Sequence, residues 1–341
     1  MKYVFLSHIN EWYGKHSGYY LYLPLLVKKY VSDCRLILFC STPLKLHLHK
    51  LIRIFLGVTL EDIQFIYQVH RSGSDQLNII LDIEERLEIK ELWNGMKLPR
   101  NVIATIHYPA STWNKRSLHL LSRYSSAIML YQKDIPFFEK YIGRDRIAFV
   151  RHGVDVDFFI PAKMEERRRE VVIVGQFHRD WKVVQQVLMN RLETDSETIF
   201  NFIIPLRKLI RKMPWVREHK QIKVHSRITD QQLLSIYQRS RLMFLPLVHS
   251  GANNAVVEAM SCGLPIVTTD VGGIRDYGGG SIYELAAPGC VDSHQALLDR
   301  YLDGTDLCSR ISKDIRDFSV RYLDWKVVVP EHLKAYRELA K

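Results

Sequence analysis

The stretch that decides the fold is HSGANNAVVEAMSCGLPIVTTDVGGIRDYGGG, residues 249–280. It follows an apolar run that ends at Leu247. We expect a helix over 255–262, with Gly263 in the position just past its last turn. A buried strand is then expected over 264–270. Strand, small-residue loop, helix and strand in this order indicate one repeat of a doubly wound α/β sheet.

The loop that opens this helix reads Ser-Gly-Ala-Asn-Asn over 250–254. Such a loop exposes backbone N–H groups at the positive end of the helix dipole, which suits a phosphate or diphosphate. Asn253 or Asn254 also suits the role of helix cap. Glu258 lies about one turn inside the helix, where a buried carboxylate without a partner would be costly. It either accepts hydrogen bonds from the hydroxyls of a sugar or pairs with a neighbouring donor.

Outward from this stretch, short apolar runs typical of buried strands alternate with amphipathic stretches typical of helices. This pattern occurs twice and predicts two parallel sheets, in agreement with two domains for 341 residues. We expect the boundary within 151–170, and one or two helices broken at Pro330 in the last 24 residues. The expected strands lie at 3–7, 35–40, 63–67, 78–83, 101–106, 127–131, 147–150, 170–175, 199–204, 221–226, 241–247 and 264–270, and two expected helices at 20–31 and 229–240.

Composition excludes several classes of protein. No apolar run is long enough to span a membrane, and the polar N-terminal region argues against a secretory signal. The five cysteines are widely spread and lack zinc-ligand spacing, which indicates reduced thiols in a cytoplasmic protein. The net charge of +11, of which residues 1–150 carry +7, fits nucleic acid, an anionic membrane surface or a phosphorylated substrate.

The run VVEAMSCGLPIVTTDVGG (256–273) closely resembles the donor-site signature of glycosyltransferase family 4. Further landmarks occur in the family's order over about residues 100–330. They are the strand ATIHYP (104–109), the interdomain linker RHGVDVDFFIP (151–161), the phosphate loop VVIVGQFHRDWK (171–182) and the nucleobase frame IKVHSRITDQQLLSIYQRSRLMFLPL (222–247).

This resemblance implies the GT-B fold, in which two Rossmann-like domains face a cleft. Residues 1–155 would form the acceptor domain, the C-terminal helix at 322–341 would cross back to it, and 156–321 would form the donor domain. The implied reaction transfers a sugar from UDP-, GDP- or another nucleotide-diphosphate sugar to an acceptor hydroxyl, with retention and without a metal or other cofactor. The acceptor would be a carbohydrate, a glycolipid or another glycosylated molecule, in polysaccharide, glycan or glycolipid biosynthesis.

Roles of single residues follow from the same resemblance. Glu258 matches the second Glu of the family's Glu-x7-Glu motif, which holds the donor ribose. Lys182 matches the Lys on the diphosphate, and His107 matches the His that contacts the donor sugar. These three are the expected catalytic residues. The expected donor-binding set is Gly18, Gln176, Arg179, Lys182, Arg227, Ile228, Ser250, Gly251, Ala252, Asn253, Asn254, Ala255 and Glu258.

Two positions depart from the family pattern. Ser250 stands where the first Glu of the motif is expected, and Gln176 replaces the usual Arg after the strand glycine. Our hypothesis is that Arg179, three residues later, supplies the missing charge. These departures keep an alternative open, a catalytically impaired sugar-nucleotide-binding or scaffold protein.

Other chemistry has little support in the motifs. The chain has no D-x-D, H-E-x-x-H or G-x-S-x-G motif. The glycines at 278–280 do not open a helix after a strand, as a dinucleotide fingerprint would. A GT-B epimerase is a further alternative. Charge alone suggests a nucleic-acid binder, but the chain has no recognised nucleic-acid-binding motif, and we expect no such partner.

Two basic stretches remain. Six cations between Arg207 and Lys220 alternate with apolar residues, and we prefer a solvated outer helix face to a membrane-surface helix there. In the first domain HLHKLIRIFLG (47–57) mixes cations with apolar residues. Since the acceptor side of GT-B enzymes often meets membranes, we expect this basic N-terminal segment to contact a lipid-linked or polymeric acceptor at the cytoplasmic membrane surface.

Overall fold

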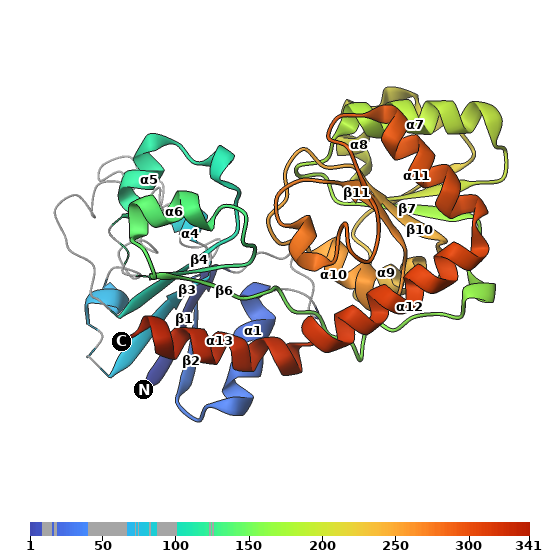
Figure 1. Ribbon diagram of the computed structural model, residues 1–341. Helices are drawn as coiled ribbons and strands as arrows, with labels where there is room; N and C mark the ends of the chain where they lie inside the picture. The colour runs from blue at the N-terminus through green and yellow to red at the C-terminus, as the bar shows by residue number, and fades with distance from the viewer. Residues whose placement is uncertain are drawn as a thin grey trace, which may run out of the picture. The chain divides into compact units, whose positions relative to one another are not determined.

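The computed structural model describes residues 1–8, 16, 19–39, 67–71, 73, 75–81, 83–86, 101–122, 124 and 126–341. The chain divides into two compact units (Figure 1). The N-terminal unit comprises Met1–Arg151 and Val328–Lys341, and the C-terminal unit comprises His152–Val327. The boundaries expected after residues 155 and 321 differ from these by a few residues, and the acceptor and donor roles of the two units stay predictions.

A six-stranded parallel sheet in the order β2-β1-β3-β4-β5-β6 forms the centre of the N-terminal unit. In Figure 1, α1 and α13 lie on one side of this sheet, and α5 and α6 lie on the other. The elements are β1 (Lys2–His8), α1 (Tyr19–Tyr30), β2 (Cys34–Phe39), β3 (Gln76–Ile80), α4 (Ile83–Arg86), β4 (Val102–Ile106), η2 (Ala110–Thr112), α5 (Lys115–Leu121), β5 (Ser126–Met129), α6 (Ile135–Ile142), β6 (Ile147–Phe149) and α13 (Trp325–Leu339).

Strand β1 shows why the sheet is covered on both faces. Val4 and Leu6 belong to the apolar cluster that includes α5 and α6. The rings of Tyr3 and Phe5 instead lie 6.4 and 6.1 Å from the ring of Tyr336 on α13. Because successive side chains of a strand point to opposite faces, an uninterrupted apolar run requires a helix layer on each side.

The C-terminal unit also has a six-stranded parallel sheet, in the order β12-β11-β10-β7-β8-β9. Helices α7, α8 and α11 lie on one side of it, and α9, α10 and α12 on the other (Figure 1). The elements are η3 (Met164–Glu166), β7 (Glu170–Val174), α7 (Trp181–Thr194), β8 (Ile199–Ile203), α8 (Leu206–Lys212), η4 (Pro214–Glu218), β9 (Ile222–His225), α9 (Asp230–Arg239), β10 (Leu242–Leu245), α10 (Asn254–Ser261), β11 (Ile266–Thr269), η5 (Ile274–Tyr277), β12 (Leu285–Ala286), α11 (Val291–Asp303) and α12 (Thr305–Tyr322).

Two sequence predictions were wrong in detail, and one strand was not predicted. Tyr67, expected at the end of a strand, lies in the helical turn 67–70, and the rest of that expected strand lies outside the described residues. Pro330 does not break the last helix, because α13 continues through it. A proline removes one backbone hydrogen bond, and the burial of Leu333 and Tyr336 beyond it outweighs that loss. The two-residue strand β12 was missed, since it lacks an apolar run.

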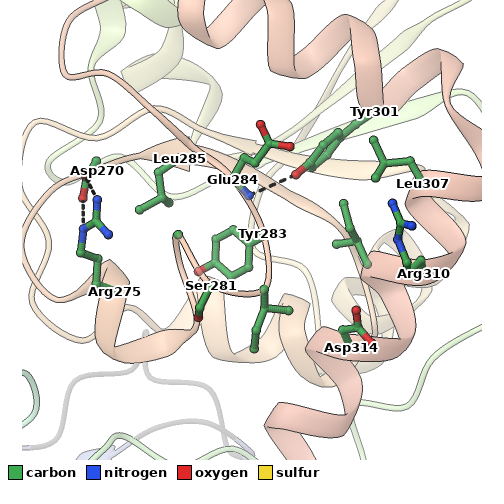
Figure 2. A pocket seen from close by; sticks show the side chains of 13 residues that line it. Asp270, Arg275, Ser281, Tyr283, Glu284, Leu285, Tyr301, Leu307, Arg310 and Asp314 are labelled. Carbon is green, nitrogen blue, oxygen red and sulfur yellow. Dashed lines mark hydrogen bonds and ion pairs between the residues drawn. The ribbon is translucent and has the colours of Figure 1, made fainter.

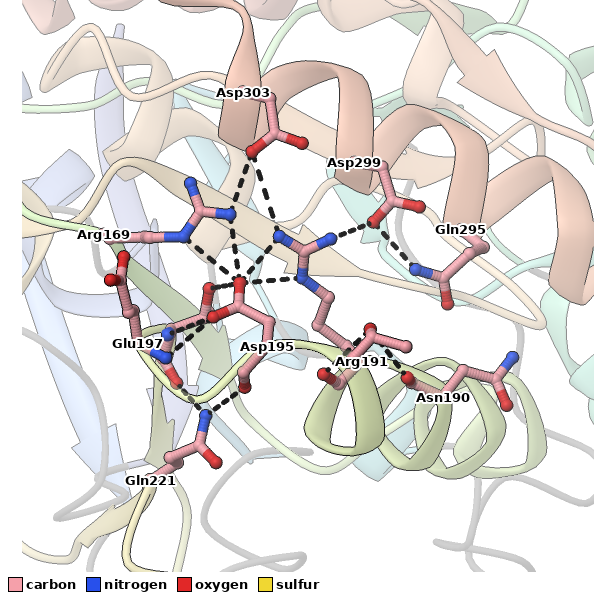
Figure 3. Close-up of polar contacts among 11 residues, drawn as sticks. Arg169, Asn190, Arg191, Asp195, Glu197, Gln221, Gln295, Asp299 and Asp303 are labelled. Carbon is pink, nitrogen blue, oxygen red and sulfur yellow. Dashed lines mark hydrogen bonds and ion pairs between the residues drawn. The ribbon is translucent and has the colours of Figure 1, made fainter.

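A cluster of charged side chains joins the residue before β7, the C-terminal end of α7 and α11 (Figure 3). The carboxylate of Asp195 accepts hydrogen bonds from the guanidiniums of Arg169 and Arg191 at 3.0 and 2.7 Å and from the hydroxyl of Thr198 at 2.6 Å. Arg169 and Arg191 reach in turn to Asp303 and Asp299 on α11. The cluster therefore connects α7 and α11, which are far apart in the sequence, to the start of β7, the first strand of the C-terminal unit.

Replacing Asp195 by Asn is expected to destabilise the C-terminal unit by about 2–4 kcal/mol. Burial would raise the pKa of this carboxyl, but the hydroxyl of Thr198, backbone N–H groups and Arg169 together hold the pKa well below its usual value. A lowered pKa stabilises the fold above the unfolded value near 4 and loses that contribution as pH falls. Urea titrations between pH 3 and 7 should show a steeper acid loss for the wild type than for Asp195→Asn.

Candidate functional site

The centre of the C-terminal sheet is a topological switch point. The chain leaves β7 towards β8 on one side and leaves β10 towards β11 on the other. Ligands of doubly wound sheets bind outside the carboxyl ends of the strands at such a point. Two loops border it, 175–180 after β7 and 246–253 after β10. Six of the thirteen donor-binding residues predicted from the sequence lie in these two loops, namely Gln176, Arg179, Ser250, Gly251, Ala252 and Asn253.

Direct contacts hold these two loops together. The N–H of Asp180 donates to the carbonyl of Pro246 at 3.0 Å, and the N–H of Val248 donates to that of His178 at 2.9 Å. Between them Arg179 and Leu247 pair as an antiparallel bridge. The imidazole centroids of His178 and His249 lie 6.0 Å apart. Residues separated by about seventy positions in the sequence thus form one surface, which local patterns could not predict.

His178 has an unusual backbone and electrostatic setting. Its φ of 57° lies in the left-handed region, where side chains other than glycine are uncommon. Burial lowers the pKa of its imidazole, and the neighbouring His249 and Arg179 lower it further. Neither histidine belongs to the family pattern that the sequence resembles, so neither was predicted as a site residue.

Two helices begin at these loops with capped N-termini. The Asp180 carboxylate accepts from the N–H of Val183 at 3.1 Å at the start of α7. The Asn253 side chain accepts from the N–H of Ala255 at 3.1 Å at the start of α10, so Asn253 is the cap that the sequence left open. Lys182 is the second residue of α7, and its side chain is exposed. The Lys182 ammonium in the first turn of α7 and the N-termini of α7 and α10 give this edge a positive potential.

Helix α10 also ends as the sequence predicted. Gly263 has a φ of 57°, and its N–H donates to the carbonyl of Met260 at 3.0 Å. The N–H of Leu264 donates to the carbonyl of Ala259 at 2.8 Å. These two bonds form a Schellman motif, in which a glycine adopts the left-handed conformation after the last turn.

Ser250 is buried and held by its neighbours. Its hydroxyl donates to the carbonyl of Gly251 at 3.0 Å, and its own carbonyl accepts from the N–H of Gly273 at 3.0 Å. Gly272 passes so close that a Cβ built on it would lie 1.7 Å from the carbonyl oxygen of Ser250. The glycine pair of the 271–273 turn therefore sets the position of the loop before α10.

Glu258 is buried on α10, and its Oε2 accepts a hydrogen bond from the hydroxyl of Tyr237 on α9 at 2.9 Å. Burial, together with the Glu258 carboxylate, raises the pKa of Tyr237 well above its usual value, so the phenol remains a donor. Of the two interpretations from the sequence, pairing with a neighbouring donor is therefore present in the structure. Ribose binding by the carboxylate stays a prediction.

The guanidinium of Arg179 folds back on the phosphate loop. Its Nε and Nη2 donate to the carbonyl of Val174 at 2.8 and 2.6 Å, and its Nη1 donates to that of Phe177 at 2.8 Å. Burial lowers its pKa to about 10, so the group stays charged at neutral pH. Gln176 is half-buried, and its amide makes no hydrogen bond to any residue that the structure describes. Arg179 thus fixes the loop, and its compensating role for Gln176 stays a prediction.

Replacing Arg179 by Ala is expected to lower both stability and nucleotide affinity, because two loop carbonyls lose their donors. We expect a stability loss of about 1–3 kcal/mol. Lys182→Ala is the matched control, since its exposed side chain should affect affinity without stability. Thermal unfolding and nucleotide titration separate the two effects. Unchanged donor affinity in Arg179→Ala would exclude the charge-compensation hypothesis.

The loop between β9 and α9 carries Arg227 and Ile228. Arg227 is exposed and has a left-handed φ of 54°, while Ile228 packs against the apolar core. Thr229 starts α9 with a capping box, in which its hydroxyl and the Gln232 side chain each satisfy a backbone N–H. The anchored Ile228 and the capped helix together hold Arg227 in its strained conformation.

His107 lies in the N-terminal unit just after β4. Its Nε2 lies 2.7 Å from the carbonyl of Leu81, which follows β3. The Glu84 carboxylate accepts from the backbone N–H groups of His107 and Tyr108 at 2.6 and 2.8 Å. The ring therefore sits at the carboxyl edge of that unit's sheet. The predicted Gly18 and the basic segment 47–57 lie outside the described residues.

A buried histidine that the sequence did not single out fixes the ends of β10 and β11. His294 Nδ1 lies 2.7 Å from the carbonyl of Cys290, and its Nε2 lies 2.9 Å from the hydroxyl of Thr269. That hydroxyl also accepts from the N–H of Leu247 at 2.8 Å. Because a carbonyl only accepts, Nδ1 carries the proton and Nε2 accepts from Thr269. Burial lowers the pKa of His294, which favours this neutral form.

A buried arginine binds the far ends of the helices that start at the site. Arg167 Nη1 donates to the carbonyls of Tyr237 and Ser240 at the C-terminus of α9, at 3.0 and 2.8 Å. Its Nη2 donates to those of Cys262 and Gly263 after α10, at 2.8 and 3.2 Å. One guanidinium thus satisfies carbonyls that both helices would otherwise leave without partners.

A separate pocket lies between η5, the 280–285 segment and α12 (Figure 2). The ion pair of Asp270 and Arg275 borders one end, and Leu307 and Arg310 border the other. No residue predicted from the sequence lines this pocket. The candidate site therefore rests on the loops at the switch point.

Comparisons with known proteins agree with this architecture. Residues 168–300 match the family model described as Glycosyl transferases group 1, and this range includes both loops at the switch point. The chain is 23% identical over 207 residues to the MMP alpha-(1->4)-mannosyltransferase of Mycolicibacterium hassiacum. That match covers 58% of this chain and 49% of the relative, so the chain spans about half the length of the curated protein that it matches.

Two solved structures share the fold over almost the whole chain. The sucrose-phosphate synthase of Thermosynechococcus elongatus superposes with a TM-score of 0.75 at 12% identity, covering 99% of both chains. Anabaena HepE in complex with UDP-glucose superposes with a TM-score of 0.72 at 14% identity, covering 98% of this chain and 100% of that one. The chain therefore has the GT-B fold, and its residues 168–300 match the glycosyl transferases group 1 model.

Proposed function

We propose that this protein is a glycosyltransferase that moves a sugar from a nucleotide-diphosphate sugar to an acceptor hydroxyl. One observation carries the proposal. The residues that match the glycosyl transferases group 1 model include the two loops that meet at the switch point, beside two capped helix N-termini and an exposed lysine. This arrangement suits the binding of a diphosphate.

Each group at this edge then has a role in the proposed reaction. The donor diphosphate lies against the N-termini of α7 and α10, and Lys182 offsets the charge that grows on it as the sugar leaves. Glu258 accepts hydrogen bonds from the ribose while the hydroxyl of Tyr237 keeps the carboxylate in place. The nucleobase lies by Arg227 and Ile228, and the sugar lies beyond the loop at 250–254. We propose from the family resemblance alone that His107 contacts the donor sugar.

Retention, metal independence and the acceptor class belong to the same proposal. In the front-face mechanism that the resemblance implies, the acceptor oxygen bonds to the anomeric carbon on the side that the diphosphate leaves. The departing phosphate takes the acceptor proton. Helix N–H groups and Lys182 supply the positive charge that a metal would otherwise provide. We propose a carbohydrate or glycolipid acceptor, in glycan or polysaccharide biosynthesis.

A specific observation favours a second candidate, a protein that binds sugar nucleotides without turnover. The short Ser250 side chain is bonded to the carbonyl of Gly251, so it does not replace the carboxylate that the family places there. Such a protein would keep the diphosphate and ribose contacts and lack the contact to the sugar.

Calorimetric titration with UDP, GDP and a panel of nucleotide sugars tests both candidates. Saturable binding with slow release of free sugar, unaffected by EDTA, is the result expected for a metal-independent transferase. Binding without turnover with any acceptor favours the second candidate. No binding of any nucleotide would contradict both, and loss of turnover in EDTA would contradict metal independence. An anomer-resolved proton NMR spectrum of the product tests retention.

A further inference from the structure

The strongest surface charge of the described part of the chain lies on α8, η4, β9 and the loop after β9. Residues 207–227 contain eight lysines and arginines and one acid, Glu218. All eight cations are exposed. They are Arg207, Lys208, Arg211, Lys212, Arg217, Lys220, Lys223 and Arg227, which we call the basic edge.

No cation of the basic edge forms an ion pair with another described residue. The arginines of the cluster in Figure 3, by contrast, are matched by aspartates. A solvated outer face, as preferred from the sequence, would not need this imbalance of charge. A surface that keeps seven net positive charges unpaired within twenty-one residues indicates a polyanionic partner.

Exposed apolar side chains accompany these cations. Phe177, at the tip of the loop after β7, is 74% exposed, and Leu206 at the start of α8 is 41% exposed. The ammonium of Lys208 lies 6.0 Å from the centroid of the Phe177 ring, so an exposed aromatic and the basic edge are contiguous. Cations beside exposed apolar groups are typical of surfaces that lie on an anionic bilayer. A soluble polyanion would use the cations and leave the apolar groups in water.

We propose that the basic edge docks the protein on the surface of an anionic lipid bilayer. No helix in the described ranges is long and apolar enough to cross a membrane, so this contact is peripheral. The cations meet the lipid headgroups, and Phe177 and Leu206 enter the headgroup region. Because Arg227 is both in the basic edge and in the predicted donor site, docking places that site close to the bilayer surface.

Co-sedimentation with vesicles tests this proposal without any need for turnover. The full chain is mixed with vesicles of phosphatidylcholine alone or with 30% phosphatidylglycerol added, at low and high salt. We expect binding to the anionic vesicles alone, weakened by salt because the attraction is screened. The double variant Arg207→Glu/Arg211→Glu should lower the partition coefficient at least about tenfold. Phe177→Ser should weaken binding and leave its salt dependence unchanged.

The matched control is Arg310→Glu/Lys313→Glu, which makes the same change in net charge on the exposed face of α12. It should retain vesicle binding, and an equal loss in both double variants would overturn the proposal. Binding to RNA or heparin without binding to vesicles would overturn it too. Arg207→Gln/Arg211→Gln is a milder second variant, expected to give an intermediate loss, and circular dichroism shows that each variant is folded. Failure of nucleotide binding would contradict the proposed function and leave this result unaffected.

Discussion

The variant Gly272→Ala should lose about 3 kcal/mol or more of folding free energy, a large effect for a single methyl group. A Cβ at this position would lie 1.7 Å from the carbonyl oxygen and 2.8 Å from the carbonyl carbon of Ser250. Both are backbone atoms, so no side-chain rotation relieves the overlap. Either the 271–273 turn or the loop before α10 must move. Chemical denaturation of the purified variant measures the loss.

The chain provides a matched control for this experiment. Gly289 has a φ of +66°, close to the +54° of Gly272, but no atom lies within 4 Å of a Cβ built there. Gly289→Ala therefore carries the cost of the left-handed conformation alone, about 1–2 kcal/mol. The difference between the two variants isolates the close approach to Ser250. Equal losses would show that this approach does not constrain the loop.

The second large effect is expected for Glu258→Gln, with nucleotide affinity reduced about 30-fold, or 2 kcal/mol. Glutamine keeps the shape of the side chain and still accepts from the hydroxyl of Tyr237. It loses the negative charge that, in the proposed function, receives the two ribose hydroxyls. Titration with UDP and GDP measures the change, and the corresponding 2′,3′-dideoxy nucleotides should bind both proteins equally.

Tyr237→Phe separates the two interpretations of Glu258. Its loss of the 2.9 Å hydrogen bond to Glu258 should lower stability by about 1–2 kcal/mol and leave most nucleotide affinity in place. If Glu258→Gln instead bound nucleotides like the wild type, the carboxylate would serve only to pair with Tyr237. The ribose assignment would then be wrong, even if the protein binds sugar nucleotides.

Most of the fold could be predicted because its signals are local. Eleven of the expected apolar runs coincide with strands, and the ends of α10 follow from Asn253 and Gly263. β12 was missed because two residues do not make a pattern. The break expected at Pro330 was wrong because α13 is stabilised beyond the proline by tertiary burial of its side chains, which a local stretch of sequence does not reveal.

For the candidate site, too, the features set by local sequence could be predicted and the tertiary contacts could not. The sequence placed the 250–254 loop at a helix N-terminus, where the structure has it. It assigned Lys182 to the phosphate loop, whereas the structure has this lysine in the first turn of α7. It could not predict the partners that tertiary structure brings together, such as His178 beside His249 or the guanidinium of Arg179 on the carbonyl of Val174. Local sequence patterns do not determine which distant residue a polar side chain contacts in the folded protein.

Arg167 places a positive charge behind the candidate site before any ligand binds. Its guanidinium meets the negative ends of α9 and α10, whose positive ends face the carboxyl edge of the sheet, where the donor nucleotide is proposed to bind. Burial lowers the pKa of Arg167 only to about 10, so this charge is in place at neutral pH. When the chain folds, the charge of Arg167 therefore offsets the negative ends of the two helix dipoles and fixes the orientation of both helices. An anionic nucleotide that binds at the N-terminal ends would meet dipoles that are already oriented. Binding therefore avoids the solvent reorganisation that two helices without a cation at their C-terminal ends would require.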